Sequence, residues 1–387
     1  MTRVASTTLA AQAGEAGVRH LGIGSTLGEL LRHPAFAGYA RRLLPRDDVA
    51  IDETLPIERL GSLLPYHSHV VPGVVLGALN HLIDEVGRGT PVFHELYTPA
   101  EQQDDPTKAS TGLFFFRGRP GAPFALIAPG GGFSYVGSVH EGLPYALEIS
   151  REGYNAFVLR YRVGQGGGAA TEDMAAAIAY VFRHAGRLGI GTAHYSLWGS
   201  SAGARMAAAI GSHGVAGFGG GELPRPAAVV MAYTGHSEVA SDEPPTFVVV
   251  GEQDAIAPPS VMARRVDRLR GQGTPVEFHR YPNVGHGFEL GTGTSAEGWV
   301  RAAIRFWERA MPRPKREFES RWSHHCLQDC FLRCLELTPR RRIVQISPRR
   351  FLTGTPGADV LEHLEAPKLL GSRRLGDSAR RRAGTAP

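Results

Sequence analysis

The segment Tyr195–Met206 holds a serine in a setting that can make it a nucleophile. Residues typical of a strand lead into GSSAG (Gly199–Gly203), and residues typical of a helix follow. A serine on such a sharp turn has a strained backbone, so only small residues fit two positions before and after it. The outer glycines satisfy this for Ser201, whereas Ser200 would place a tryptophan and an alanine there. We therefore expect Ser201 to be the nucleophile, at a helix N-terminus whose free amides favour negative charge.

A nucleophilic serine needs a base and a group that orients the base. His286 is the predicted base, because it lies between two glycines in a loop after the last predicted strand, Val276–Tyr281. Asp254 is the predicted orienting acid, because it follows the strand Thr246–Val250 and sites form at the carboxyl ends of parallel strands. Glu252 is the competing acid. Asp254 is preferred because it lies deeper in the turn, before two prolines.

The third requirement is a set of donors for the oxyanion, and these are predicted after an earlier strand, Phe124–Ala128. Three glycines follow Pro129, and amides without a neighbouring Cβ can point into a site. The predicted donors are the N–H groups of Gly131, Gly132 and Ala202. Each motif alone has an ordinary explanation, such as a flexible turn, a helix-capping aspartate or a surface histidine. Their order, each after a different strand, favours the catalytic interpretation.

Strands and helices alternate over residues 91–312, which we predict to be one domain. The predicted strands are Val92–Tyr97, Leu113–Arg117, Phe124–Ala128, Ala156–Leu159, Tyr195–Trp198, Ala227–Met231, Thr246–Val250 and Val276–Tyr281. The predicted helices are Gly142–Glu152, Thr171–Leu188, Ala202–Ser212, Ser260–Gly271 and Ser295–Ala310. Short apolar strands separated by helices are typical of a parallel sheet covered on both faces. The predicted fold class is therefore α/β, with a doubly wound, mostly parallel sheet.

Residues 1–90 carry no chemical motif and are predicted to form a helical extension on the main domain, which is a candidate lid. Helical pieces are predicted over Ala35–Leu44 and Val74–Val86. His67 and His69 could line a pocket. Two histidines so placed in a loop are more often solvated, and we expect that here.

The formal net charge of +5 belongs to the C-terminal part of the chain. Residues 313–387 hold 16 Lys and Arg against 8 Asp and Glu, whereas residues 1–312 hold 26 against 29. An acidic main body argues against a nucleic-acid partner, and the tail is predicted to be basic and disordered. All three cysteines, Cys326, Cys330 and Cys334, lie in this tail. The main body has none, so no disulfide framework supports its fold. The spacing of the three cysteines lacks a metal clamp, so no metal is expected.

No apolar run approaches 18 residues, and the first residues are too polar for a convincing signal segment. We therefore predict no membrane span and a cytoplasmic location. The oligomeric state is not indicated.

Residues 91–312 resemble the α/β-hydrolase superfamily, in particular its bacterial esterase/lipase branch with feruloyl- and acetyl-esterase-like domains. The motifs that carry the resemblance are PGGGF (Pro129–Phe133), GSSAG (Gly199–Gly203), GEQDAIAPP (Gly251–Pro259) and GHGF (Gly285–Phe288). Pro129 stands where many members have a histidine, so the glycine loop lacks a side chain that anchors it. Arg160 stands where many members have an aspartate.

The resemblance implies two-step acyl transfer on a small-molecule carboxylic ester, with a short, acetyl or aromatic acyl group and no metal or organic cofactor. Two alternatives stay open: a serine peptidase or aminopeptidase of the same fold, and a non-catalytic binding protein on this fold. Glu141, Arg160 and Arg162 either contact the substrate or form a buried polar network beneath the site. The sequence does not separate these two roles.

Overall fold

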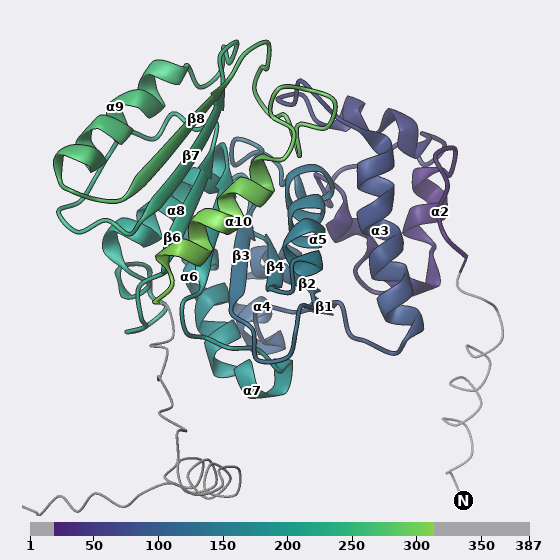
Figure 1. Ribbon diagram of the computed structural model, residues 1–387. Helices are drawn as coiled ribbons and strands as arrows, with labels where there is room; N and C mark the ends of the chain where they lie inside the picture. The colour runs from purple at the N-terminus through teal and green to yellow at the C-terminus, as the bar shows by residue number, and fades with distance from the viewer. Residues whose placement is uncertain (1–18, 313–387) are drawn as a thin grey trace, which may run out of the picture. The chain divides into compact units, whose positions relative to one another are not determined.

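The computed structural model describes residues 19–312, and its centre is an eight-stranded sheet in the order β1-β2-β4-β3-β5-β6-β7-β8 (Figure 1). The strands are β1 (Phe93–His94), β2 (Gly112–Phe116), β3 (Phe124–Ala128), β4 (Asn155–Arg160), β5 (Ser196–Ser200), β6 (Ala228–Ala232), β7 (Thr246–Gly251) and β8 (Val276–Tyr281). The pairs β1–β2 and β2–β4 are antiparallel, and the other neighbours are parallel. Each predicted strand overlaps one of these eight.

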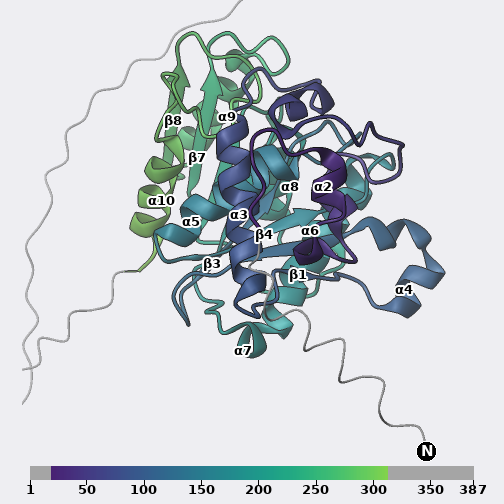
Figure 2. The ribbon, with the colours of Figure 1, turned by 90° about the vertical axis from the view of Figure 1, so that its right-hand side faces the viewer.

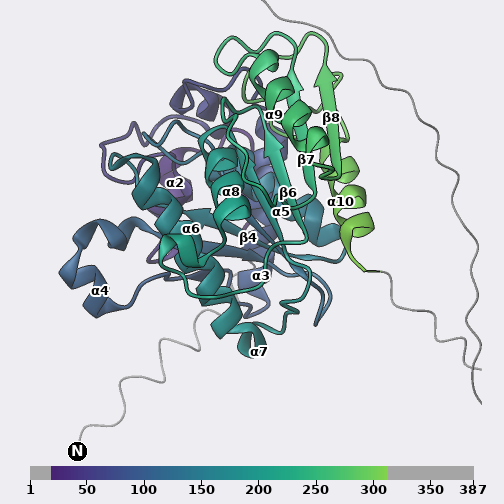
Figure 3. The ribbon, with the colours of Figure 1, turned by 90° about the vertical axis from the view of Figure 1, so that its left-hand side faces the viewer.

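Helices cover both faces of the sheet. Helices α5 (Leu143–Arg151) and α10 (Trp299–Ala310) pack on one face. Helices α6 (Gly166–Arg183), α8 (Ala202–His213) and α9 (Pro259–Gly271) lie on the other, which Figure 3 shows from the front. The remaining α-helices of the described residues are α2 (Leu27–Leu31), α3 (Pro72–Gly87), α4 (Pro99–Asp104) and α7 (Ala185–Leu188). The predicted doubly wound sheet is confirmed, while the predicted tail, residues 313–387, lies outside the described residues.

The strands are short apolar runs because the sheet is buried between two helical layers. Every residue of β2 to β7 is buried. Aromatic side chains of neighbouring strands pack on each other on the faces of the sheet, as where the paired Phe115 and Phe157 stack at 4.3 Å. Strand β8 lies at the edge of the sheet, and its residues are only partly buried. Because β3, β5, β7 and β8 run parallel to one another, their carboxyl ends lie on one side of the sheet and lead into loops there.

Residues 19–90 share the core of the main domain. Helix α3 packs on α5, and Figure 2 shows α2 and α3 from the side on which they lie. The ring of Tyr39 stacks on Phe93 of β1 at 4.7 Å. The single helix predicted over Ala35–Leu44 is wrong, because Gly38 has φ of +88° and divides the segment into two short 3₁₀ turns.

Arg160, the last residue of β4, and Arg162, two residues later, lie in buried polar networks. The Arg160 guanidinium donates to the carbonyl of Leu44 at 2.7 Å and pairs with Asp47 at 2.9 Å. Both partners belong to the N-terminal segment, so a buried charge of the sheet depends on that segment for compensation. Arg162 pairs with the buried Asp173 at 2.9 Å. Of the two roles left open for these arginines, the structure shows the buried network.

Within residues 19–312, no helix has both the length and the apolar character needed to cross a membrane.

Candidate active site

Ser201 lies on the turn between β5 and α8, and its backbone is strained there. Its φ is +49° and its ψ is −113°, values that residues with a side chain rarely adopt. The glycines on either side are sterically required. A Cβ on Gly203 would lie 1.9 Å from the carbonyl oxygen of Ala128, and one on Gly199 would lie 2.3 Å from the backbone of Gly203. The strain and the need for small neighbours that the sequence predicts are both present.

The structure brings Ser201, His286 and Asp254 together in one hydrogen-bonded line. Nε2 of His286 lies 3.0 Å from the Ser201 hydroxyl, and Nδ1 lies 2.8 Å from a carboxylate oxygen of Asp254. The other Asp254 oxygen accepts the backbone N–H groups of Ile256 and Ala257, at 2.9 and 2.7 Å. These two bonds fix the carboxylate, and the carboxylate fixes the imidazole.

The tautomer of His286 follows from its partners. A carboxylate only accepts, so Nδ1 carries the proton and Nε2 presents a lone pair to the serine hydroxyl. Asp254 and His286 are 4% and 5% exposed, which strengthens electrostatic contacts between them. The competing acid, Glu252, points away to a surface pair with Arg280 at 3.3 Å. The structure thus places Asp254, and not Glu252, on the histidine.

The glycine loop after β3 lies directly against Ser201. A Cβ on Gly130 would lie 3.0 Å from the Cβ of Ser201. Gly131 and Gly132 have φ of +132° and +60°, which favour glycine. Across residues 19–312, the backbone N–H groups of Gly131, Gly132 and Ala202 meet no hydrogen-bond acceptor. Free amides beside the serine are what binding of an oxyanion requires.

The glycine loop is anchored although Pro129 replaces the expected histidine. One oxygen of the Glu141 carboxylate accepts the N–H of Gly130 at 2.5 Å, and the Tyr161 hydroxyl donates to the Pro129 carbonyl at 2.8 Å. The other Glu141 oxygen accepts the hydroxyl of Tyr233 at 2.8 Å. Glu141 lies in a π-helical turn, Ser138–Gly142, just before α5. Of the roles left open for Glu141, the structure shows the buried network beneath the site.

The prediction that His67 is solvated is wrong. Its side chain is only 2% exposed, and Nε2 donates to Glu141 at 2.8 Å. His69 contacts the carbonyl of Thr292 at 2.8 Å.

His67, His140 and Glu141 form a group whose possible metal-ligand atoms lie within 4.8 Å of one another. The pKa of His140 is lowered to about 3 by burial and by its histidine neighbours, so its imidazole is neutral.

A second buried carboxyl, Glu289, lies three residues after His286. It is completely buried, and the N–H of Val71 donates to one of its oxygens at 3.2 Å. In the described part of the chain, its other oxygen has no hydrogen-bond partner. Burial, together with the charge of Glu141, raises the pKa of Glu289 to about 8.

Replacing Glu289 by glutamine is expected to stabilise the protein at alkaline pH. Because the folded pKa of about 8 exceeds the ordinary value of 4.5, the folded state holds a proton that the unfolded state releases. The free energy of unfolding of the wild type therefore falls as the pH rises from about 4.5 to about 8 and then levels off. Urea unfolding at pH 5, 7 and 9 should show a growing advantage of Glu289→Gln, reaching a few kcal/mol. A constant difference across this range would contradict the prediction.

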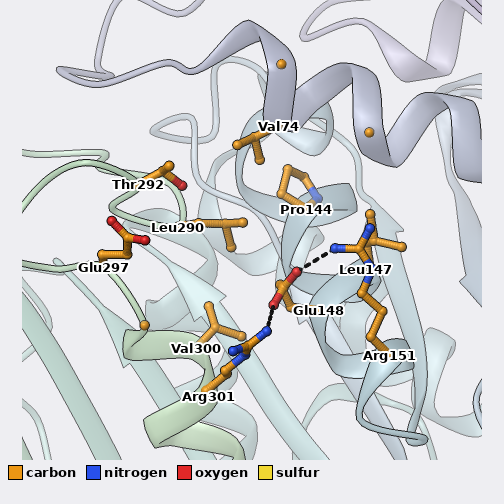
Figure 4. A pocket seen from close by; sticks show the side chains of 13 residues that line it. Val74, Pro144, Leu147, Glu148, Arg151, Leu290, Thr292, Glu297, Val300 and Arg301 are labelled. Carbon is orange, nitrogen blue, oxygen red and sulfur yellow. Dashed lines mark hydrogen bonds and ion pairs between the residues drawn. The ribbon is translucent and has the colours of Figure 1, made fainter.

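A separate cavity of about 380 Å³ lies between α3, α5, α10 and the loop after His286 (Figure 4). Its charged groups are largely paired with one another. Glu148 accepts from Arg151 at 2.8 Å and lies 3.6 Å from Arg301. Ser201, Asp254 and His286 are not among the residues that line it.

The sheet order, the helical layers and the loops that carry Ser201, Asp254 and His286 are those of the α/β-hydrolase fold. Two family models match the chain: the BD-FAE model over residues 121–218, and the model of the prolyl oligopeptidase family over residues 224–313. Together with the fold, these two matches confirm the predicted resemblance to an esterase-like α/β-hydrolase family.

Several solved structures are similar over about half of the chain. MGS-M1, an α/β-hydrolase enzyme from a Medee basin deep-sea metagenome library, is 26% identical, with 52% of this chain and 92% of that chain covered and a TM-score of 0.45. An acetyl ester-xyloside bifunctional hydrolase from Caldicellulosiruptor lactoaceticus is 23% identical, with 51% and 88% covered and a TM-score of 0.46. The carboxylesterase Cest-2923 from Lactobacillus plantarum WCFS1 is 18% identical, with 53% and 94% covered and a TM-score of 0.46. No curated protein matches the sequence.

Proposed function

We propose that the protein is a serine hydrolase that cleaves carboxylic esters of short or aromatic acyl groups. The observation that carries this proposal is the hydrogen-bonded line from Asp254 through His286 to Ser201, on a strained turn at the carboxyl edge of the sheet. A serine, an imidazole of defined tautomer and an orienting carboxylate are the groups that nucleophilic acyl transfer requires besides donors for the oxyanion.

The reaction proceeds in two steps. The Ser201 oxygen attacks the ester carbonyl carbon while Nε2 of His286 takes the hydroxyl proton, and Asp254 stabilises the resulting imidazolium. The tetrahedral oxyanion accepts from the N–H groups of Gly131, Gly132 and Ala202. The carbon–oxygen bond to the alcohol then breaks, and His286 returns the proton to the leaving oxygen. Water hydrolyses the acyl-serine by the same path, with His286 as base.

An aromatic ring at the glycine loop supports the choice of acyl group. Tyr66 is 41% exposed, and its ring edge would lie 3.1 Å from a Cβ on Gly132. The same ring stacks on Tyr135 at 5.6 Å, which holds it in place. A fixed, exposed ring beside the oxyanion amides can stack on an aromatic acyl group, and it limits the length of an aliphatic one.

The match to the prolyl oligopeptidase family favours one second candidate, a serine peptidase. Hydrolysis of p-nitrophenyl acetate, butyrate, octanoate and benzoate, next to a panel of peptidyl p-nitroanilides, separates the two. We expect kcat/KM to be highest for the acetate, butyrate and benzoate esters, and peptide amides to be cleaved slowly or not at all. Cleavage of the anilides with no ester hydrolysis above background would replace the esterase proposal by the peptidase.

A further inference from the structure

The segment Tyr66–His69, which we call the strap, contacts both loops that carry the catalytic groups. One is the oxyanion loop, residues 129–137, and the other is the histidine loop, residues 283–292. The strap belongs to the N-terminal segment, about 60 residues before the oxyanion loop and about 220 before the histidine loop in sequence. One short piece of chain thus contacts both the loop of the oxyanion donors and the loop of the base.

On the oxyanion side, the contact runs through two buried side chains. His67 donates to Glu141 at 2.8 Å, and Glu141 holds the N–H of Gly130 at 2.5 Å. The hydroxyl of Tyr135, a residue of the oxyanion loop, lies 3.0 Å from the other ring nitrogen of His67. The imidazole is therefore held at both nitrogens, and each contact leads to the loop that presents Gly131 and Gly132.

On the histidine side, the strap bonds to the backbone. The N–H of Ser68 donates to the carbonyl of His286 at 2.9 Å, and the N–H of His69 donates to the carbonyl of Gly287 at 3.4 Å. The packing is close as well, since a Cβ on Gly287 would lie 2.7 Å from the ring of His67. The position of the His286 backbone is thereby tied to that of the strap.

Removing the imidazole of His67 would leave the Glu141 carboxylate short of one donor in a fully buried place. The side chains of His67 and Glu141 are 2% and 0% exposed. Burial alone would raise the pKa of Glu141, but the contacts with His67 and with the hydroxyl of Tyr233 hold it at about 2. A buried carboxylate that loses a donor shifts towards its remaining donors or takes up a proton, and either change alters its bond to Gly130.

We propose that the strap sets the geometry between the oxyanion amides and the catalytic histidine, and that His67 acts as a positioning residue through Glu141. The inference rests on the proposed function, because it assigns His67 a part in acyl transfer at Ser201. The strap is then a fixed component of the active site and not part of a movable lid.

The first test compares His67→Ala with His81→Ala. His81 is a half-buried imidazole on α3, stacked on Phe116, so its loss controls for loss of an imidazole from the N-terminal segment. We expect kcat of His67→Ala for p-nitrophenyl acetate to fall about 10- to 100-fold with KM changed by less than about threefold, because small displacements of catalytic groups are costly. His67→Gln should recover most of kcat, since its amide N–H can donate to Glu141. Equal kcat losses in His67→Ala and His81→Ala, or no loss in either, would overturn the proposal.

The second test does not need an active enzyme. Hydrogen–deuterium exchange should be faster in peptides from both the oxyanion loop and the histidine loop of His67→Ala, and unchanged in helix α9. Unchanged exchange in the two loops would overturn the positioning role, even if wild-type activity were absent and the proposed function had failed. The remaining alternative is a metal ion held by His67, His140 and Glu141, and elemental analysis of the purified wild type tests it. A transition metal at one equivalent that is lost in His67→Ala would make His67 and Glu141 ligands, and would also overturn the proposal.

Discussion

The variant Ser201→Ala is expected to lose about a million-fold in kcat for p-nitrophenyl acetate, because it has no nucleophile and the remaining groups cannot replace one. The fold should persist. The Ser201 backbone N–H still donates to Ala232 at 2.8 Å, and the side chain bonds only to His286 among the described residues. Circular dichroism should therefore match the wild type, and the loss of rate should appear in kcat.

The neighbouring serine supplies the matched control. Ser200 is buried, and its hydroxyl lies 3.3 Å from that of Tyr145, in the buried polar network beneath the site. Ser200→Ala should keep kcat within about tenfold of the wild type, since no reacting atom is removed. A fluorophosphonate probe should add one label to the wild type and to Ser200→Ala, and none to Ser201→Ala. The reverse pattern would show that Ser200 is the nucleophile.

The sheet could be predicted because its strands are short apolar runs between clear helical segments. The run Phe247–Val250 is buried on both faces, as its composition indicates. The ends of helices are harder to predict where a glycine with positive φ lies beside them. Helix α10 begins at Trp299, and not at the predicted Ser295, because Gly298 has φ of +86° just before it. Local composition thus determines most of the main domain.

The proximity of Ser201, Asp254 and His286 could also be predicted, because each residue follows a different strand and parallel strands end on one side of the sheet. Asp254 and Glu252 occupy the same turn, and the preference for Asp254 came from its depth in that turn. The structure shows the physical basis. The amides of Ile256 and Ala257 hold the Asp254 carboxylate, whereas Glu252 reaches only a surface arginine.

The support beneath the glycine loop could not be read from local pattern. His67 and Glu141 lie 74 residues apart, and their contact depends on the packing of the whole N-terminal segment. The sequence did hold one signal for the part that Glu141 plays in this support. Because Pro129 removes the usual anchor, the loop needs another buried acceptor, and Glu141 is the acidic residue that follows it within 12 positions. The role of His67 could have been found only from the structure, because its sequence neighbourhood has the composition of a solvated loop.

The variant Asp254→Asn is expected to lower kcat about 10⁴-fold at neutral pH while the site keeps its shape. Asparagine retains an oxygen that can accept the N–H groups of Ile256 and Ala257. Its amide nitrogen would then face Nδ1 of His286 and donate to it. The imidazole proton moves to Nε2 in response, and a protonated Nε2 cannot accept the proton of Ser201. The loss therefore arises from the wrong tautomer, and KM should change little.

The matched control is Glu252→Gln, which removes the other carboxylate of the same turn. Its partner is Arg280 at the surface, and exposed ion pairs of this kind contribute little to stability. The kcat should therefore stay within about twofold of the wild type, and the free energy of unfolding within about 1 kcal/mol. The comparison is decisive in both directions. A large loss in Glu252→Gln with an active Asp254→Asn would make Glu252 the orienting acid. A loss in Asp254→Asn of only a few-fold would mean that His286 reaches its reactive tautomer without a carboxylate, and that burial and the Tyr233 ring, 5.0 Å away, are enough to orient it.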